Sequence, residues 1–284
     1  MTISFKLYRE FGALNSGPVF DAFEQGLKTL GYTSSTQGEV AVIWSVLWNG
    51  RMLGNRQVFN RSQQNNKPII VLEVGGIQRG TTWKVGINGI NHGCFSLDNL
   101  DPNRPNRLGL ELQPWRTSGD HILICGQHER SLQWQSMPKT SQWVFETINT
   151  LRQYTDRKIV VRPHPRSPFT FLNARQVGII KEQPRMIPGT YDDYDMKFKG
   201  VHAVINWSSN PGIRAVLNGV PAFVGPHSLA YDVANYDLDR IESPAKPDRE
   251  SWLVEYAHTE WTLDEIASGQ PLSRLMPKIQ EQLS

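Results

Sequence analysis

The sequence predicts an α/β protein made of two doubly wound halves that face each other across a cleft. The first observation is a series of apolar runs typical of buried strands; they cover 40–47, 69–72, 121–125, 158–162, 203–205 and 220–224. The second is that apolar residues recur at helical spacing between several of these runs, as over 18–30 and 140–154. The third is the length of 284 residues, which suits two domains of ordinary size.

The composition is that of a globular protein with a mildly basic charge. Hydrophobic residues make up 39% and charged residues 20%, and the formal net charge is +3. No apolar run reaches the length needed to cross a bilayer, and the first ten residues resemble a strand rather than a signal peptide. Cys94 and Cys125 are too few for a disulfide framework. We therefore expect a cytoplasmic protein without a transmembrane segment, whose charge allows an anionic substrate.

The first half opens with a strand over 5–8, a loop of small residues and a helix that begins at Pro18. The loop ends in Asn15, Ser16 and Gly17, so that small and polar residues lie between the strand and the helix. This order predicts a ligand cradle in the first half of the protein.

Glu73 follows the apolar strand 69–72 and precedes Gly75 and Gly76. A carboxylate at the carboxyl end of a central strand lies on the crevice side of an open α/β sheet, where such folds bind ligands. Glu73 is therefore a candidate general base that takes a proton from a hydroxyl. The alternative is a carboxylate that caps the following turn.

Residues 78–106 are rich in Gly, Asn, Asp and Pro and are too long for an ordinary connection. We interpret this segment as an acceptor-side surface. The side chains expected there are those of Arg79, Trp83, Asn91 and, just beyond, Trp115.

The second half begins near residue 118, and its first strand, 121–125, is followed by Gly126 and Gln127. The next strand, 158–162, leads into His164, which two prolines flank and hold in place. Arg162 and Arg166 add positive charge beside this histidine, which favours an anionic phosphate over a metal ion. The alternative is a structural histidine in a proline-rich loop.

A strand–turn–helix–turn–strand unit covers 203–225. Its first turn contains Ser208, Ser209 and Asn210, and Pro211 suits the start of the helix. A hydroxyl-bearing turn at a helix N-terminus is a common phosphate site, because unpaired N–H groups and a partial positive charge meet there. The alternative is an ordinary turn in which the serines only cap the helix.

Four motifs, in this order, resemble the capsule polysaccharide Kdo-transferase group and bacterial sialyltransferases of the GT-B fold. They are Glu73-Val-Gly-Gly, Gly89-Ile-Asn, Arg162-Pro-His-Pro, and Ser208-Ser209 before the helix that ends in Asn218-Gly-Val-Pro. The segment 260–269 also resembles the C-terminal segment of the capsule group. The resemblance covers most of the chain from about residue 68 onward.

The resemblance implies a GT-B-like fold of two Rossmann-like domains and a role for each motif. Glu73 would be the catalytic carboxylate, while His164 with Ser208 and Ser209 would hold the phosphate of the leaving nucleotide. Gly126 and Gln127 would line the nucleotide pocket, with Ser16 and Gly17 across the cleft. Arg162, Arg166 and Asn210 complete the expected donor site. Arg214 stands where related enzymes often carry a glutamate that contacts the ribose.

We therefore expect a metal-independent glycosyltransferase without a cofactor that uses a CMP- or UDP-linked sugar and a surface or capsular glycan acceptor. Its predicted parts are an acceptor-side domain over 1–117, a nucleotide-sugar domain over 118–258 and a helical segment over 259–284 that packs back on the first. One alternative is a virus-type DNA glycosyltransferase that modifies hydroxymethylated pyrimidines, which the basic residues between Arg79 and Arg116 motivate. Another is a non-catalytic nucleotide- or sugar-binding module.

Overall fold

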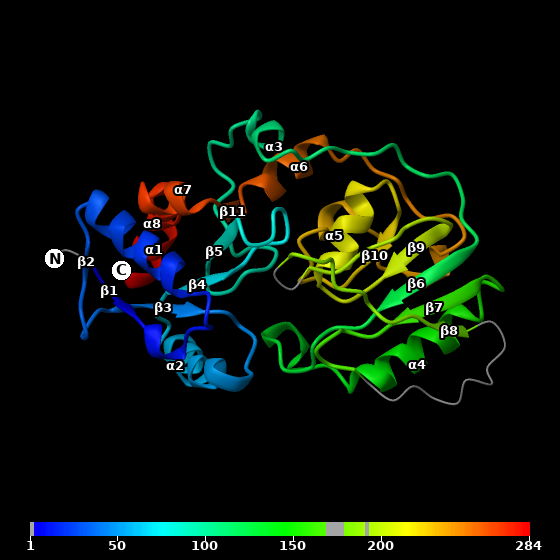
Figure 1. Cartoon of the computed structure of the whole chain (residues 1–284), viewed down its shortest axis with the longest axis horizontal. Helices are drawn as coiled ribbons and strands as arrows, with labels where there is room; N and C mark the ends of the chain where they lie inside the picture. Colours follow the sequence, from blue (N-terminus) through cyan, green and yellow to red (C-terminus); the bar gives the residue numbers. More distant parts are fainter. Residues whose placement is uncertain (1–2, 169–178, 191–192) are drawn as a thin grey trace. The chain divides into compact units, whose positions relative to one another are not determined.

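The computed structural model of the chain describes residues 3–168, 179–190 and 193–284 (Figure 1). The chain divides into two compact units. Unit 1 comprises residues 1–108 and 254–284, and unit 2 comprises residues 109–253. The sequence prediction set its boundaries after residues 117 and 258. Both units are mixed α/β structures with strands that pair in parallel.

Unit 1 contains a six-stranded sheet in the order β11-β5-β4-β3-β1-β2. Four strands pair in parallel, namely β1 (Ser4–Leu7), β2 (Thr33–Ser34), β3 (Val40–Trp44) and β4 (Ile69–Val74). The other two, β5 (Trp83–Ile87) and β11 (Glu260–Trp261), run antiparallel to their neighbours. The sheet is therefore mixed rather than purely parallel, and 78–106 is not one long loop, because β5 lies within it.

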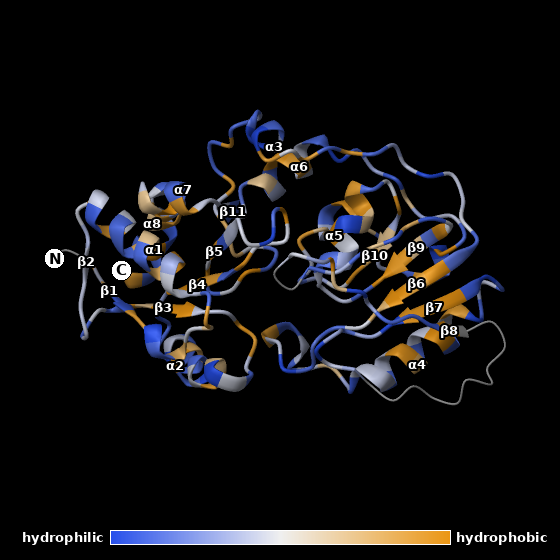
Figure 2. Ribbon diagram, viewed as in Figure 1, coloured by the Kyte–Doolittle hydropathy of each residue, from blue (hydrophilic) through white to orange (hydrophobic). Residues whose placement is uncertain are grey.

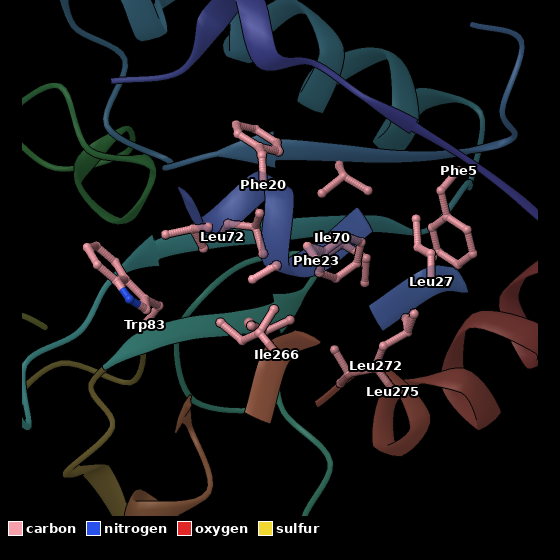
Figure 3. Close-up of a cluster of buried hydrophobic side chains, with 14 of the residues drawn as sticks. Phe5, Phe20, Phe23, Leu27, Ile70, Leu72, Trp83, Ile266, Leu272 and Leu275 are labelled. Carbon is pink, nitrogen blue, oxygen red and sulfur yellow. The ribbon is translucent and has the colours of Figure 1, made fainter. Parts of the chain in front are cut away.

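The core of unit 1 lies between this sheet and three helices. These are α1 (Gly17–Thr29), α7 (Leu263–Ala267) and α8 (Gln270–Leu283). Figure 3 shows Phe20, Phe23 and Leu27 of α1 beside Ile70 and Leu72 of β4. The other face of the sheet carries α2 (Leu53–Gln64) (Figure 1). The C-terminal helices thus complete a core that the first thirty residues begin.

The shorter helices of unit 1 lie in its connections. They are η1 (Arg9–Phe11), η2 (Gly50–Met52) and α3 (Arg104–Arg107). The division between the units falls within α6 (Glu250–Ala257). A capping box starts α7, where the Thr262 hydroxyl accepts from the N–H of Glu265 and the Glu265 carboxylate accepts from the N–H of Thr262.

Unit 2 contains a five-stranded sheet in which every pairing is parallel, in the order β10-β9-β6-β7-β8. The strands are β6 (His121–Cys125), β7 (Lys158–Arg162), β8 (Ile179–Lys181), β9 (Val201–Ile205) and β10 (Ala222–Phe223). The strong hydrophobicity of β6, β7 and β9 is visible in Figure 2 and reflects burial on both faces of the sheet. The sequence also indicates a short strand over 176–180, of which 176–178 lie outside the described residues.

Two helices cover opposite faces of the sheet of unit 2 (Figure 1). They are α4 (Thr140–Leu151) and α5 (Asn210–Leu217). Val144, Ile148 and Leu151 of α4 pack on buried residues of β6, β7 and β9. Single 3-10 turns η3 (Leu132–Trp134), η4 (Tyr231–Val233) and η5 (Leu238–Arg240) lie in the connections. Within the described ranges no helix is long and apolar enough to span a bilayer.

Candidate functional site

In unit 1, the candidate site is built on the carboxyl ends of β3 and β4. Glu73, near the end of β4, is half-buried. Its Oε2 accepts a hydrogen bond of 2.5 Å from the Ser45 hydroxyl, and its Oε1 accepts one of 2.9 Å from the N–H of Val74. A carboxylate held by a neighbouring hydroxyl and a backbone N–H has a defined orientation at this edge of the sheet.

Ser45 is a member of this site that the sequence analysis missed. It follows β3 directly, is only 2% exposed, and has a φ of 66°, in the left-handed region that non-glycine residues rarely adopt. Its N–H donates to the carbonyl of Leu72, and its hydroxyl also accepts from the N–H of Leu47. This conformation ends β3 at Trp44, before the predicted end at residue 47, and points the hydroxyl at Glu73. Backbone strain of this kind is often found at functional sites.

A row of charged side chains extends from Glu73 across the next two strands. In the antiparallel register, Lys84 of β5 pairs with Glu73 of β4 on one side and with Glu260 of β11 on the other. Directly opposed residues of adjacent strands share one face of a sheet, so the three side chains are neighbours. We call Glu73, Lys84 and Glu260 the charged row. The Lys84 Nζ lies 3.9 Å from the Glu260 carboxylate.

Glu260 is fully buried and holds the turn that follows β4. Its carboxylate accepts from the N–H of Gly76 at 2.7 Å, the N–H of Ile77 at 2.9 Å and the hydroxyl of Thr82 at 2.8 Å. Gly75 packs so closely here that a Cβ would lie 2.3 Å from both a Glu260 carboxylate oxygen and the Thr82 carbonyl oxygen. The glycine is therefore required by close approach, and the turn after Glu73 is fixed by a residue from the far end of the sequence.

The loop before α1 places the predicted residues Ser16 and Gly17 in the same unit. Ser16 is buried and its hydroxyl donates to the carbonyl of Ala13, so this side chain stabilises the loop itself. Gly17 is exposed as the first residue of α1. The Oδ1 atom of Asn15 is buried and has no hydrogen-bond partner among the described residues.

The predicted acceptor-side residues separate in the structure. Arg79 and Asn91 are partly buried in the segments on either side of β5. Trp83 was expected on the acceptor side, but it is 6% exposed and packs in the core, with its ring centroid 5.9 Å from that of Trp44. Trp83 is therefore a core residue, and apolar packing explains its burial. Trp115 belongs to unit 2, where its indole N–H donates to the carbonyl of Pro247.

In unit 2, the carboxyl ends of three adjacent strands bring the second group of predicted residues together. Gly126 and Gln127 follow β6, His164 follows β7 and Ser208 follows β9, with β6 between the other two strands. The N–H of Gly126 donates to the carbonyl of Arg162 at 2.8 Å. The Gln127 amide Oε1 accepts from the N–H and the hydroxyl of Ser208 at 3.0 and 3.1 Å. Residues far apart in the sequence thus form one site.

His128 is a further residue that the sequence analysis missed. Its ring lies against that of His164, with centroids 5.3 Å apart and planes at 75°. Both rings are held in the same way: the Nδ1 of His128 accepts from the N–H of Arg130, and the Nδ1 of His164 accepts from the N–H of Arg166, each at 3.1 Å. A neutral imidazole whose Nδ1 accepts carries its proton on Nε2. Both histidines are therefore Nε2–H donors in their neutral form.

The electrostatic surroundings favour an anion beside these rings. Burial lowers the pKa of His128 from its usual value of 6.5, and the charges of Arg130 and Arg166 lower it further, while Glu129 opposes them. The ring is consequently neutral at physiological pH, and its N–H is kept as a donor. The positive charges of the two arginines and the N–H donors of the two imidazoles suit the binding of a phosphate group.

The turn after β9 leads into the N-terminus of α5. Ser209 is the N-cap residue in an extended conformation, but its side chain makes no capping hydrogen bond. Instead, its hydroxyl accepts from the buried Asn206 side chain at 3.0 Å. Asn210 starts the helix and Pro211 follows it. The serines are therefore not simple caps.

Two arginines predicted near the donor are used within unit 2. Arg162 is buried, and its guanidinium donates to Glu182 at 2.5 Å and to the carbonyl of Asp195 at 3.2 Å. This ion pair links β7 to the residue that follows β8, so the guanidinium predicted to bind the donor is used within unit 2. Arg214 donates to both oxygens of Asp193, at 2.9 and 3.2 Å. Arg162 attaches the segment 193–196 to β7, and Arg214 attaches it to α5. Arg166 is exposed, and its N–H orients His164.

Metal-ligating side chains do not gather in groups of three or more within the part of the chain that the structure describes. Both cysteines are free thiols, and burial raises the pKa of Cys125 to about 12. Neither thiol lies among the residues of the two candidate sites.

Comparison with known proteins gives structural neighbours only. No protein-family model matches the sequence. No curated protein matches it either. Among solved structures, the chain is similar to the KpsC β-Kdo 2,7 transferase of Thermosulfurimonas dismutans, with a TM-score of 0.46 and 15% identity over 95% of this chain and 99% of that one. It is also similar to the KpsC β-Kdo 2,4 transferase of the same organism, with a TM-score of 0.49 and 12% identity over 100% and 99%.

Proposed function

We propose that the chain is a glycosyltransferase that moves a sugar from a nucleotide-sugar donor to an acceptor hydroxyl. The observation that carries the proposal is the gathering of His128, His164, Gln127 and Ser208 at three adjacent strand ends, beside a helix N-terminus. The carboxyl edge of a parallel sheet is where such folds bind nucleotides, and a helix N-terminus favours phosphate. The resemblance of the sequence motifs to the Kdo-transferase group supports the same assignment.

The donor belongs to unit 2 in this proposal. The Nε2–H groups of His164 and His128 and the Ser208 hydroxyl donate to the phosphate that leaves with the nucleoside. As the bond between the sugar carbon and the phosphate oxygen breaks, negative charge grows on that phosphate. Donors that are already fixed by Gln127, Arg130 and Arg166 stabilise this charge without reorganising.

Asp193 is the group that we propose for the ribose of the nucleotide. Arg214 occupies the position where related enzymes carry a glutamate, and it donates only. The ion pair places the Asp193 carboxylate beside it, and both side chains are three-quarters or more buried. A carboxylate supplied from this segment accepts hydrogen bonds from ribose hydroxyls in place of the missing glutamate.

Glu73 of unit 1 is the proposed general base. Its carboxylate takes the proton of the acceptor hydroxyl as the acceptor oxygen forms a bond to the sugar carbon, and the nucleoside phosphate departs with the electrons of the broken bond. Ser45 orients the carboxylate through the 2.5 Å hydrogen bond. The donor in this reaction is a CMP- or UDP-linked sugar, and the acceptor is a glycan.

DNA is the less favoured acceptor because basic residues between 79 and 116 are used within the protein. Arg104 is buried and forms an ion pair with Glu265, and Arg107 pairs with Asp101. Arg116 donates to the carbonyl of Phe198. A DNA-binding surface would instead leave such side chains for phosphates, with an affinity that falls steeply as salt rises.

The test is sugar transfer from a panel of CMP- and UDP-linked sugars, in EDTA, to glycan and hydroxymethylated-DNA acceptors, with products identified by mass. Wild-type protein is expected to give a glycosylated glycan, and Glu73→Gln to give none while it binds donor as tightly as wild type. Transfer to DNA alone would replace the acceptor in this proposal. Binding of a nucleotide sugar without transfer to either acceptor would favour a non-catalytic binding module.

A further inference from the structure

We propose that unit 1 contains an accessory sugar-binding site in a cavity of about 550 Å³ between the loop 88–94 and the helix α8. Small-molecule sites in proteins usually have volumes of about 300–1,000 Å³. The ligand that we infer is a sugar unit of the glycan acceptor, so this inference rests on the proposed function. We call the site the loop–α8 cavity, and its lining includes Ile87, Asn88, Cys94, Lys278, Glu281 and Gln282.

The loop–α8 cavity lies toward the edge of the sheet that is opposite to the carboxyl end of β4. Ile87, the last residue of β5, pairs with Ile70 near the start of β4, whereas Glu73 pairs with Lys84. The two levels are three residues apart along β5, which corresponds to about 10 Å. The cavity is therefore separate from the Glu73 site, and the two can be mutated independently.

The loop that forms one wall of the cavity is held in a defined conformation. The N–H of Asn88 donates to the carbonyl of Ile69 at 2.7 Å, and its side-chain Oδ1 accepts from the N–H of Ile69 at 3.1 Å. Asn88 has a φ of 58°, in the left-handed region, and a Cβ at Gly89 would lie 2.8 Å from the Cys94 sulfur. The Gly89-Ile-Asn motif, which the proposed reaction does not use, thus shapes this wall.

The helix α8 forms the other wall and is joined to the loop by two hydrogen bonds. The Gln282 Oε1 accepts from the Asn88 side-chain amide at 2.9 Å, and the Lys278 Nζ donates to the carbonyl of Phe95 at 2.8 Å. These contacts use the oxygen of the Gln282 amide and one of the three N–H groups of the Lys278 ammonium. The Gln282 amide N–H groups and the other Lys278 N–H groups remain as donors for a ligand.

The polar groups of α8 suit the hydroxyls of a sugar. Lys278, Glu281 and Gln282 lie three and four residues apart, so they share one face of the helix. Lys278 and Gln282 supply N–H donors, and the exposed carboxylate of Glu281 supplies acceptors. A hydroxyl donates and accepts at the same time, so neighbouring sugar hydroxyls can pair with both kinds of group.

Two other classes of ligand fit the cavity less well. A phosphate is disfavoured because Glu281 is negative and because the last turn of α8 carries the negative end of the helix dipole. A soft metal ion would need a thiolate, but burial raises the pKa of Cys94 and keeps the thiol protonated at neutral pH. The lining therefore favours a ligand whose polar groups are hydroxyls.

The closing experiment is an NMR titration of the 15N-labelled full chain with glucose, N-acetylglucosamine and glucuronic acid. We expect at least one of these sugars to bind with a Kd on the order of 1 mM and to shift the side-chain amide signals of Asn88 and Gln282. Glu281→Gln removes a charged acceptor and should weaken this binding about tenfold. The matched control is Glu39→Gln, because Glu39 is an exposed glutamate of unit 1 outside the cavity, and this variant should bind as wild type.

The outcomes separate this inference from the proposed function. Saturable shifts at the cavity in a protein that transfers no sugar would retain the site and remove the proposed reaction. Sugar transfer without shifts at Asn88 and Gln282, with each sugar at about fifty times the expected Kd, would retain the reaction and overturn the site. Equal affinities of wild type and Glu281→Gln would also overturn it, and this variant is expected to fold because the side chain is exposed.

Discussion

Replacing Ser45 by alanine and by glycine separates the two features that this residue combines. Its hydroxyl donates to the Glu73 carboxylate at 2.5 Å, and its backbone has a φ of 66°. Ser45→Ala removes the hydroxyl and keeps a Cβ in the left-handed region. Ser45→Gly removes the hydroxyl and also relieves the backbone strain, because glycine adopts positive φ without a steric cost.

The structure gives a magnitude for each variant. A hydrogen bond to a charged group contributes about 1.5–3 kcal/mol, so we expect Ser45→Ala to be destabilised by that amount. A left-handed conformation costs a residue with a Cβ about 1–2 kcal/mol, and glycine loses about 0.5–1 kcal/mol more chain entropy on folding. Ser45→Gly should therefore be more stable than Ser45→Ala by about 0.5–1 kcal/mol.

Urea unfolding measures the stability of both variants, and sugar transfer at saturating donor measures their activity. Because the chain has two units, the transition that moves should be that of unit 1. Both variants should lower kcat equally, since each leaves Glu73 without its hydroxyl partner. A glycine variant no more stable than the alanine variant would refute the strain at Ser45, and unchanged kcat in both would refute its orienting role.

Three further predictions follow from other contacts. The variant His128→Asn lacks the Nε2–H donor of His128 and should bind a nucleoside monophosphate about tenfold more weakly in calorimetry. His121→Asn, at the first residue of β6, should bind as wild type. Equal affinities in both variants would contradict the paired donors. Gly75→Ala should be destabilised by about 1–3 kcal/mol or more in urea, because its Cβ would lie 2.3 Å from the Thr82 carbonyl oxygen; a stability equal to wild type would show that the turn is looser than its contacts indicate. Burial lowers the pKa of His258, whose Nε2 accepts from the N–H of Asp101. Below about pH 6.5 the unfolded chain therefore binds more protons than the folded chain, and the stability of unit 1 should fall as pH drops. The variant His258→Gln should show a smaller fall.

The strand ends were the part of the site that could be predicted from sequence. A buried parallel strand produces a continuous apolar run, so the position of the first polar residue after it is visible in the sequence. Glu73 and Gln127 are found in this way, and His164 lies two residues beyond Arg162, the first polar residue after its apolar run. The structure places each of the three at or beside a strand end. Ser208 belongs to the same group, and its contact with Gln127 follows from the adjacency of β6 and β9.

The rest of the site depends on pairings that local patterns do not specify. Lys84 and Glu260 become neighbours of Glu73 only through the antiparallel register of β5 and β11, and β11 lies 184 residues after the turn that Glu260 holds. The strand β5 was missed because its flanking residues are rich in turn formers. Trp83 could not be assigned to the core without that strand, since an isolated tryptophan fits a core and a binding surface equally well.

Ion pairs explain the remaining differences. The charge of Arg162 predicted a phosphate contact, but a partner on the neighbouring strand, Glu182, is invisible until the register of β7 and β8 is known. His128 was missed for a related reason. It is the second residue after Gly126, and only the adjacency of β6 and β7 brings its ring against that of His164.

The most direct test of the central claim is single-turnover sugar transfer by wild-type protein and Glu73→Gln, with CMP- and UDP-linked donors and a glycan acceptor in EDTA. Donor affinity is measured on the same samples by calorimetry. We predict that wild-type protein forms the glycosylated product and that the Glu73→Gln variant binds donor with unchanged affinity but forms none. Product formation by Glu73→Gln at the wild-type rate would contradict the assignment of Glu73 as the general base.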